Sequence, residues 1–457
     1  MQNNNILADN NIKKLLLKLS LPATAGMIVM ALYNVVDTIF VGRGVGALGI
    51  AGLSIVFPIQ MIVMAFGQLL GMGGASVVSR SLGEGNIHKA NSVVGTIFSS
   101  TAIFSVIITI GFLVFKEQLL MLFGASEGIY PYAKDYYEII VFASILFITA
   151  MSTNSLVRAE GHAKVAMNTM IIGAVLNIIL DPIFIFTFNM GVRGAAWATV
   201  ISQFIAVVYI IRFINSGKSI LKIKIEHLKV KLPILKEIFA IGISSFMRNV
   251  AGSLVFALFN RALGANGGDL AIAAYGIVQR FLRLLVMPTI GIAQGMQPIA
   301  GYNYGAGRFD KVREVNKIAI IWATCVASFG FFIAQLFPSQ MMIIFTDDPE
   351  LIAMGANAMR LMMLLIPVVG FHIVGTTIFQ ALGKALPSFI LSMSREILFL
   401  IPLILVLPKF WGLNGIWLTM PISDILSFIL TAILFYNLVK HLKKPKELIL
   451  QTGSTIN

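Results

Sequence analysis

Two carboxylates lie inside long apolar stretches of this chain. Asp37 occurs in YNVVDTIFVG and Asp181 in LNIILDPIF. An ionisable side chain within a membrane span costs about 2.5 to 3.5 kcal/mol on insertion scales, so it usually binds an ion or relays a proton. If the surrounding stretches are membrane helices, this chemistry predicts a transporter that is driven by an ion gradient.

The composition of the chain indicates that its apolar stretches are membrane helices. Of the 457 residues, 58% are hydrophobic and 12% are charged, whereas an ordinary soluble protein has roughly 25% charged residues. The apolar residues run in blocks, and about 20 residues at ~1.5 Å rise each suffice to cross a bilayer. Blocks such as 102–115 and 397–407 have no polar face, which excludes a soluble multidomain protein. We therefore predict an all-α polytopic membrane protein.

Breaks at charged residues, glycines and prolines divide the chain into twelve predicted spans. An even number of spans places both termini on one side of the membrane. The spans are 15–41, 48–79, 91–115, 132–157, 165–188, 195–213, 235–263, 270–302, 312–337, 351–382, 386–407 and 413–439.

The distribution of basic residues predicts which side that is. We count 23 lysines and arginines on the side of the termini and six on the other. By the positive-inside rule, both termini are cytoplasmic in a multi-pass protein of the cell (inner or plasma) membrane. The net charge of +14 then reflects topology and attraction to anionic lipid, and we expect no nucleic-acid partner. The six outer residues are Arg43, Lys116, Lys134, Arg193, Arg261 and Lys409.

A shift of 222 residues superimposes the second half of the chain on the first. LGIAG at 48–52 falls on LAIAA at 270–274, and GEGNIHKA at 83–90 falls on GAGRFDKV at 305–312. Because each half holds six spans, the repeat is parallel and predicts two lobes around a central cleft that opens to each side in turn. A channel is disfavoured because no filter-like loop or ring of like charges is visible. The predicted boundaries are 1–214 for the first lobe, 215–233 for a basic cytoplasmic linker, 234–442 for the second lobe and 443–457 for a cytoplasmic tail.

Counting along the helices brings the two carboxylates to one depth. The first and fifth spans both run outward. Asp37 lies about 18 residues beyond Leu19 and Asp181 about 16 beyond Val165, so at ~1.5 Å per residue they reach similar levels. Asn177 shares a helix face with Asp181, Thr199 lies at a comparable depth in the sixth span, and Tyr136 could approach from the fourth. Oxygen ligands of this kind suit Na⁺, and two nearby carboxyls could instead share a proton.

A purely structural role for these acids is the alternative. Asp37 would then cap a kink or meet an arginine, and Asp181 would end a helix before Pro182. Pro22 removes a backbone donor from the first span, and Gly26 follows one turn later, so this helix is predicted to bend there. We expect ion loading to change the bend, with a static kink as the alternative.

Five arginines and a histidine lie within spans of the second half. Some of these side chains are expected to extend to the membrane–water interface or to form ion pairs, with Glu396 as a candidate partner. Together they predict a cavity for an anionic group or a gate. They are Arg248, Arg280, Arg283, Arg360, His372 and Arg395.

No motif supports catalysis. P-loop, zinc-protease and nucleophile-elbow signatures are absent from the sequence, so we expect no enzyme activity and no cofactor. No metal is expected beyond Na⁺ at Asp37 and Asp181. The glycine-rich run GMGGAS at 71–76 lies within a span and predicts close helix packing.

Several motifs together make the chain resemble the multidrug and toxic compound extrusion (MATE) family over essentially its whole length. The resemblance implies a twelve-helix antiporter that exports amphipathic, often cationic compounds in exchange for H⁺ or Na⁺. It also implies an ion site at Asp37, Asn177, Asp181 and Thr199, with Tyr136 and Asn154 in its hydrogen-bond network and Pro22 as the bend. The motifs are LP at 21–22, YNVVDTIFVG, NIILDP at 177–182, GAAWAT at 194–199, AIAAYGI at 271–277 and QGMQPIAGYNYGA at 294–306.

The second half departs from some members of that family. Those relatives bind a cation through acids in the seventh and tenth spans, where this chain offers Arg248, Asn249 and His372. The sequence is therefore most similar to the bacterial and archaeal branches with aspartates in the first lobe. A lipid-linked oligosaccharide flippase of the same superfamily and a non-transporting scaffold remain alternative functions. We expect small amphipathic substrates, a lipid bilayer as surroundings, and a monomer.

Overall fold

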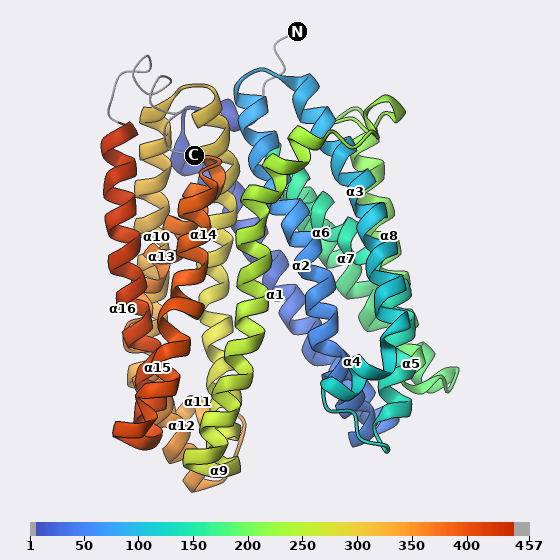
Figure 1. Cartoon of the computed structure of the whole chain (residues 1–457), viewed down its shortest axis with the longest axis vertical. Coiled ribbons are helices and arrows are strands. Elements are labelled where there is room, and N and C mark those ends of the chain that lie inside the picture. The colour runs from blue at the N-terminus through green and yellow to red at the C-terminus, as the bar shows by residue number, and fades with distance from the viewer. Residues whose placement is uncertain (1–5, 443–457) are drawn as a thin grey trace. The chain divides into compact units, whose positions relative to one another are not determined.

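The computed structural model describes residues 6–442, so the predicted tail at 443–457 lies outside the described residues. The described part of the chain is helical throughout, without strands (Figure 1). The first half comprises η1 (Ile6–Ala8), α1 (Ile12–Val45), α2 (Ala47–Gly83), α3 (Ile87–Val114), α4 (Lys116–Leu122), α5 (Tyr130–Phe142), α6 (Ser144–Ala159), α7 (Ala163–Pro182), η2 (Ile183–Thr187), α8 (Gly191–Asn215) and η3 (Ile225–His227).

The second half repeats this pattern of long helices and short turns. It comprises α9 (Leu232–Gly305), α10 (Phe309–Leu336), α11 (Pro338–Ile343), α12 (Pro349–Met362), α13 (Ile366–Ala381), α14 (Ala385–Met393), η4 (Ser394–Leu400), α15 (Ile401–Val406) and α16 (Pro408–Leu442).

These helices supply the twelve predicted spans. Within residues 6–442, nine helices are long and apolar enough to cross a membrane, and two bent pairs, α5–α6 (54°) and α12–α13 (50°), would each form one more. The 74-residue α9 is one of the nine, yet Gly268 (φ 64°, ψ −162°) breaks its helical backbone and divides it into two spans. The total is twelve, and large apolar side chains such as Leu32, Ile107 and Phe329 are exposed on these helices.

The backbone carries the predicted repeat. Three glycines with positive φ in the first half each have a counterpart 222 residues later, at a turn between equivalent spans. Gly85, for example, has φ 75° between α2 and α3, a left-handed conformation that residues with a Cβ rarely adopt. The pairs are Gly46 and Gly268, Gly85 and Gly307, and Gly161 and Gly383.

The chain divides into two compact units. Unit 1 comprises residues 6–8 and 25–246, and unit 2 comprises 9–24 and 247–442. The first part of α1 therefore belongs to unit 2, and the first part of α9 belongs to unit 1. The two division points, after Thr24 and after Phe246, are again 222 residues apart (246 minus 24). Both helices change unit at the same place in the repeat.

Small residues hold these two helix segments in their units. In unit 1, a Cβ on Gly73 of α2 would overlap the carbonyl oxygen of Ile238, and one on Gly242 of α9 would overlap that of Leu69. In unit 2, Gly295 of α9 approaches Ser20 of α1 equally closely. The predicted close packing of the run at 71–76 is therefore confirmed at Gly73. Contacts of this kind let helices approach without the bulk of side chains between them.

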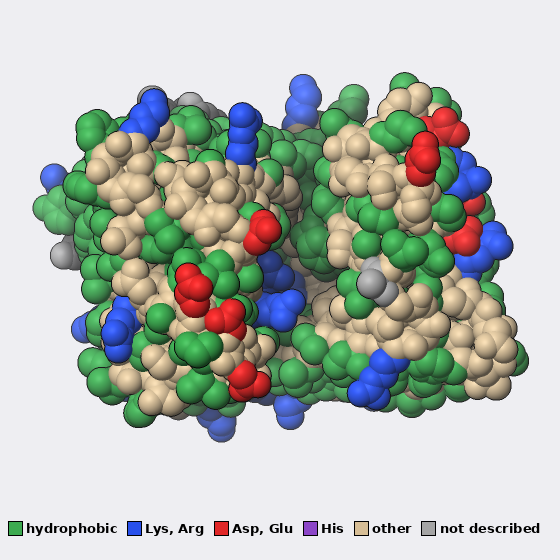
Figure 2. Space-filling view, turned by 90° about the horizontal axis from the view of Figure 1, so that it is seen from below, with side chains coloured by type: hydrophobic (Ala, Val, Ile, Leu, Met, Phe, Trp, Pro, Cys, Tyr) green, Lys and Arg blue, Asp and Glu red, His purple; other side chains and the backbone are tan. Residues whose placement is uncertain are grey.

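In unit 1 the end that holds α4, and in unit 2 the end that holds α11 and α12, carries acidic as well as basic side chains (Figure 2). Glu117 lies in the first turn of α4 and Glu350 in the first turn of α12. In unit 1, Lys116 pairs with Glu138 at 2.7 Å. Each of these ends therefore lacks the large excess of positive charge that the sequence places in the opposite turns of the same unit.

A buried carboxylate outside the spans anchors the segment between α8 and α9. Glu160, in the turn after α6, is 1% exposed. Its oxygens accept hydrogen bonds from the Ser219 hydroxyl (2.9 Å) and from the backbone N–H groups of Ile220 (3.0 Å) and Leu221 (3.3 Å). Burial raises the pKa of Glu160 from 4.5 to about 7, and these donors only partly offset it.

We predict a pH-dependent stability from Glu160. Between about pH 4.5 and 7 the folded protein holds a proton on this group that the unfolded chain has lost. Stability should therefore fall as the pH rises through this window, by about 3 kcal/mol at most. Thermal unfolding in detergent should show this slope in the wild type and not in Glu160→Gln. Glu84→Gln, which changes an exposed acid in the turn after α2, should keep the slope; equal slopes in all three proteins would contradict the prediction.

Candidate functional site

The structure brings Asp37 and Asp181 together within unit 1. Asp37 lies in the second part of α1 and Asp181 at the end of α7, and their carboxyl groups interact directly. Asp181 is fully buried. The Oδ1 atom of Asp37 is also buried and has no hydrogen-bond partner among residues 6–442. Two ionised carboxylates that lie this close together in an apolar environment repel one another unless a positive charge lies between them.

An amide on the same helix face orients Asp181. Asn177 precedes Asp181 by one turn of α7, and in the amide orientation that satisfies both ends its nitrogen donates to Asp181 Oδ2 (3.2 Å). Its oxygen then accepts from the backbone N–H of Thr199 on α8 (3.1 Å). The Thr199 hydroxyl donates to the carbonyl oxygen of Ala195 (2.9 Å). Asn177 therefore links the carboxylate to the neighbouring helix.

The local sequence explains why the carboxylate is held at this point. Pro182 follows Asp181 and has no N–H, and the chain continues as the π-helical turn η2. On α8, a Cβ at Gly194 would lie 2.8 Å from the carbonyl carbon of Phe184 in η2, so this glycine permits the close approach of the two elements. The α7–η2–α8 corner thus fixes the position of Asp181.

Two tyrosines complete the cluster. Tyr136 of α5 is 5% exposed; it lies beside the hydroxyl of Thr199 and within electrostatic range of Asp37 and Asp181. Tyr33 of α1 interacts with the same two carboxyl groups. Tyr33 was not predicted from the sequence, although its place one helical turn before Asp37 was a usable signal.

Asn154 lies elsewhere. Its amide nitrogen donates to the carbonyl oxygen of Ala166 (2.8 Å), and its oxygen accepts from the Arg158 guanidinium. Neither partner belongs to the carboxylate cluster. The resemblance placed Asn154 in the ion-site network, whereas its hydrogen bonds here join α6 to the start of α7.

The predicted bend residues lie where α1 passes from one unit to the other. The helix is continuous from Ile12 to Val45 with Pro22 inside it. Pro22 and Gly26 flank the division between Thr24 and Ala25. Gly26 packs against Met170 of α7, where a Cβ would lie 2.9 Å from the sulfur. A bend remains a prediction for these residues.

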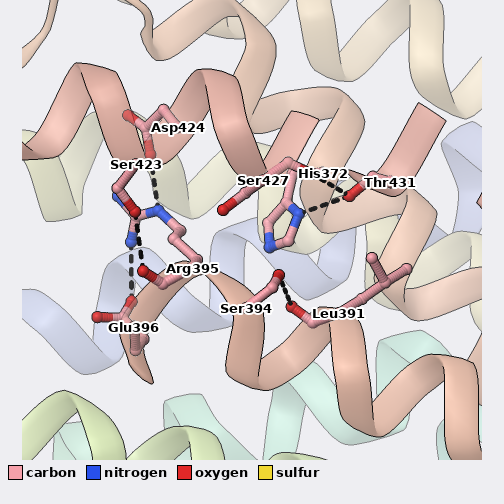
Figure 3. Close-up of polar contacts among 9 residues, drawn as sticks. All are labelled: His372, Leu391, Ser394, Arg395, Glu396, Ser423, Asp424, Ser427 and Thr431. Carbon is pink, nitrogen blue, oxygen red and sulfur yellow. Dashed lines mark hydrogen bonds and ion pairs between the residues drawn. The ribbon is translucent and has the colours of Figure 1, made fainter. Parts of the chain in front are cut away.

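In unit 2, Arg395 of η4 is held by two carboxylates (Figure 3). Its Nε donates to Asp424 Oδ1 at 2.7 Å, and Nη1 donates to Glu396 Oε1 at 2.9 Å. Nearby, His372 Nδ1 lies 2.9 Å from the Thr431 hydroxyl. Glu396 was the partner that the sequence suggested; Asp424, on α16, was not foreseen as one.

The other predicted arginines do not join this cluster through a hydrogen bond or ion pair. Arg248 lies within the electrostatic range of Glu396. Arg280 stacks over the ring of Phe345 at 5.9 Å. Arg283 and Arg360 have exposed side chains. The positive charges of Arg248 and Arg395 are balanced by the negative charges of Asp424 and Glu396. This group of side chains therefore does not form a strongly positive site for an anion.

Comparison with a family model decides the family. The model, named MatE, matches residues 22–183 and again residues 245–406, which is more than half of the chain. The chain belongs to the MatE family of membrane transporters. The two matches begin 223 residues apart (245 minus 22), so each half of this MatE transporter is one copy of the family domain.

Known relatives cover nearly the whole chain of this MatE protein. The Multidrug export protein MepA of Staphylococcus haemolyticus is 26% identical over 443 residues, 97% of each chain. The MATE multidrug transporter DinF-BH, whose structure was solved as a complex, is 43% identical, with a TM-score of 0.89, covering 95% of this chain and 97% of that one. A MATE structure described as being in the bent conformation is 26% identical, with a TM-score of 0.91, covering 98% and 100%. The twelve-helix, two-lobe fold and the multi-pass membrane location are thereby confirmed.

We predict that Asn177 stabilises the carboxylate cluster of this MatE protein. In Asn177→Leu, the buried Asp181 loses its amide donor, which should lower the free energy of unfolding by about 1–3 kcal/mol. The matched control is Asn168→Leu on the same helix, where an exposed amide makes only a long contact (3.4 Å) to Tyr209. The thermal midpoint in detergent should fall for Asn177→Leu alone. Equal midpoints for the two variants would show that the amide does not support Asp181.

Proposed function

We propose that this MatE transporter exports amphipathic, often cationic compounds in exchange for H⁺ or Na⁺. The observation that carries the proposal is the buried contact between Asp37 and Asp181, with one carboxylate oxygen left without a hydrogen-bond partner among the described residues. The relatives support the exported class of compound: one is named a multidrug export protein, and another is described as a multidrug transporter.

The chemistry of the donors fits either ion. Carboxylate, amide and hydroxyl oxygens are hard ligands that suit Na⁺. A proton held between the two carboxyl groups would relieve the same repulsion. In both cases Asp37 and Asp181 bind the cation, Asn177 orients Asp181, and the two tyrosines exclude water from the cluster.

Ion binding is proposed to act on the substrate path through α1. The second part of α1 carries Asp37, and its first part belongs to unit 2. Binding of the cation draws Asp37 towards Asp181 on α7 and thereby pulls on the second part of α1. The helix bends most easily around Pro22, because the proline lacks a backbone N–H and one helical hydrogen bond is missing there. A bend there would alter how unit 1 and unit 2 are connected, which is the step that alternating access requires.

The proposed topology follows from charge. Both termini and the segment between α8 and α9 would face the cytoplasm in the cell membrane, because the basic residues concentrate in these turns. The compounds would then leave on the opposite side, where acidic and basic side chains are mixed (Figure 2). No chemical transformation of the substrate is proposed.

We predict that Asp37→Asn and Asp181→Asn each abolish ion-driven export while leaving expression intact. An amide keeps the shape of the side chain but cannot exchange a cation, so the rate should fall at least about tenfold, the factor for ~1.4 kcal/mol. The measurement is ethidium export from proteoliposomes under an imposed proton or sodium gradient. Asp135→Asn, which changes an exposed acid 3.7 Å from Arg193, is the matched control.

The gradient that drives export identifies the coupling ion. Full export by both carboxylate variants would refute the assigned ion site and leave export itself intact. Absence of dye movement under every gradient would refute the antiport function and favour the flippase alternative.

A further inference from the structure

A polar recess of about 530 Å³ lies beside the start of α3, outside the membrane spans. It belongs to unit 1 and shares no residue with the Asp37–Asp181 cluster. Figure 1 shows the start of α3 near the top of the view, beside the loop that leads from α8 to α9. The lining residues are His88, Asn91, Lys224, Glu226, His227 and Lys231.

One face of α3 is built to hold the loop that forms the recess. A Cβ on Gly95 would overlap the carbonyl oxygen of His227, so the glycine allows the turn η3 to lie directly on the helix. One turn away on either side, the Ser99 hydroxyl donates to the carbonyl oxygen of Leu228, and Ser92 accepts from Lys231 Nζ at 2.9 Å. Asn91 Oδ1 accepts from the backbone N–H of Lys222 (2.9 Å). The recess is therefore a built feature of unit 1.

The lining carries a net positive charge, with two lysines against one glutamate. Glu226 is the single acid among the six residues; it pairs with Lys224 at 3.0 Å, and its Oε1 also lies 3.7 Å from His227 Nε2. The ammonium of Lys231 has no carboxylate partner within the described chain. Two imidazoles, His88 and His227, add donors and lie edge to face with 5.5 Å between their centroids. The positive end of the α3 dipole points to the same place.

Three exposed apolar residues, here called the apolar rim, flank the residues of this basic recess in the sequence. Ile87, Leu228 and Leu232 are 47%, 38% and 65% exposed, and each is next in sequence to a lining residue. The recess is lined by the start of α3, just after α2 ends at Gly83, and both helices are candidate membrane spans. The ends of membrane spans are where lipid headgroups lie. A ligand with a phosphate beside acyl chains matches both features: phosphate accepts hydrogen bonds from ammonium and imidazole groups, and acyl chains cover leucine and isoleucine.

We propose that this recess binds the phosphate headgroup of an anionic phospholipid from the adjoining leaflet. Lys231 and Lys224 contact the phosphate, His88 and His227 donate to its oxygens, and the acyl chains lie on the apolar rim. A lipid bound here fixes the loop against α3, and with it the first part of α9. The site stands independently of the proposed antiport.

The test measures lipid that stays bound to the full-length protein. Protein reconstituted in phosphatidylcholine nanodiscs containing phosphatidylglycerol is extracted, and retained lipid is counted by native mass spectrometry. The double variant Lys224→Gln and Lys231→Gln should retain phosphatidylglycerol about fivefold less for each lysine removed. The control, Lys218→Gln with Lys229→Gln, removes the same charge from exposed positions of the same loop that do not line the recess, and should retain wild-type amounts.

A second variant guards against a folding defect. His88→Asp places a negative charge at an exposed position of the recess and should also lower retention, while its thermal midpoint in pure phosphatidylcholine stays at the wild-type value. Equal losses in the control pair would overturn the site in favour of general surface attraction. If inorganic phosphate raises the thermal midpoint of the lipid-free protein and phosphatidylglycerol is not retained, the ligand is free phosphate and the lipid proposal is wrong.

Discussion

The contact between two carboxyl groups inside the apolar helices of unit 1 is the constraint on which the rest depends. Charges separated by a few ångströms in a medium of low dielectric repel strongly, and desolvation adds to the cost. Asn177, Thr199, Tyr33 and Tyr136 surround the pair with amide and hydroxyl groups, yet none of them carries a compensating positive charge. A mobile cation is the remaining source of that charge, and a transporter can use its arrival and departure.

The repeat gives this local event a wider effect. α1 and α9 occupy equivalent places in the two halves, and each begins in the unit of the other half. Glycine contacts on α2 and α9 hold these first segments close to their neighbours. Asp37 acts on the second segment of α1 only, so a change at the cluster is transmitted along one continuous helix past Pro22. The second half has no counterpart of this arrangement, because Phe259 and Leu403 stand 222 residues after Asp37 and Asp181.

The parts that the sequence predicted well are those that depend on simple geometry. Span lengths, the repeat and the equal depth of Asp37 and Asp181 follow from hydropathy and a rise of ~1.5 Å per residue. Asn177 was predictable because residues four apart share a helix face. Asn154 was assigned to the ion site by resemblance alone. It lies one turn before Arg158 on α6, where its hydrogen-bond partners are Arg158 and the carbonyl group of Ala166.

Contacts between distant helices could not be predicted by such reasoning. The pairing of Arg395 with Asp424 joins η4 to α16 across 29 residues, and the rotation of each helix about its axis decides whether the two side chains meet.

Infrared difference spectroscopy of the carboxyl groups tests the central claim most directly. Protonated carboxyls absorb apart from ionised ones, so titrating the purified protein in lipid reports whether the pair exchanges its cation. We expect a protonated-carboxyl band that disappears within the physiological pH range or on addition of Na⁺, and that is absent from the Asp37→Asn, Asp181→Asn double variant. A wild-type spectrum that never differs from that of the double variant, at any pH or sodium concentration, would contradict the account.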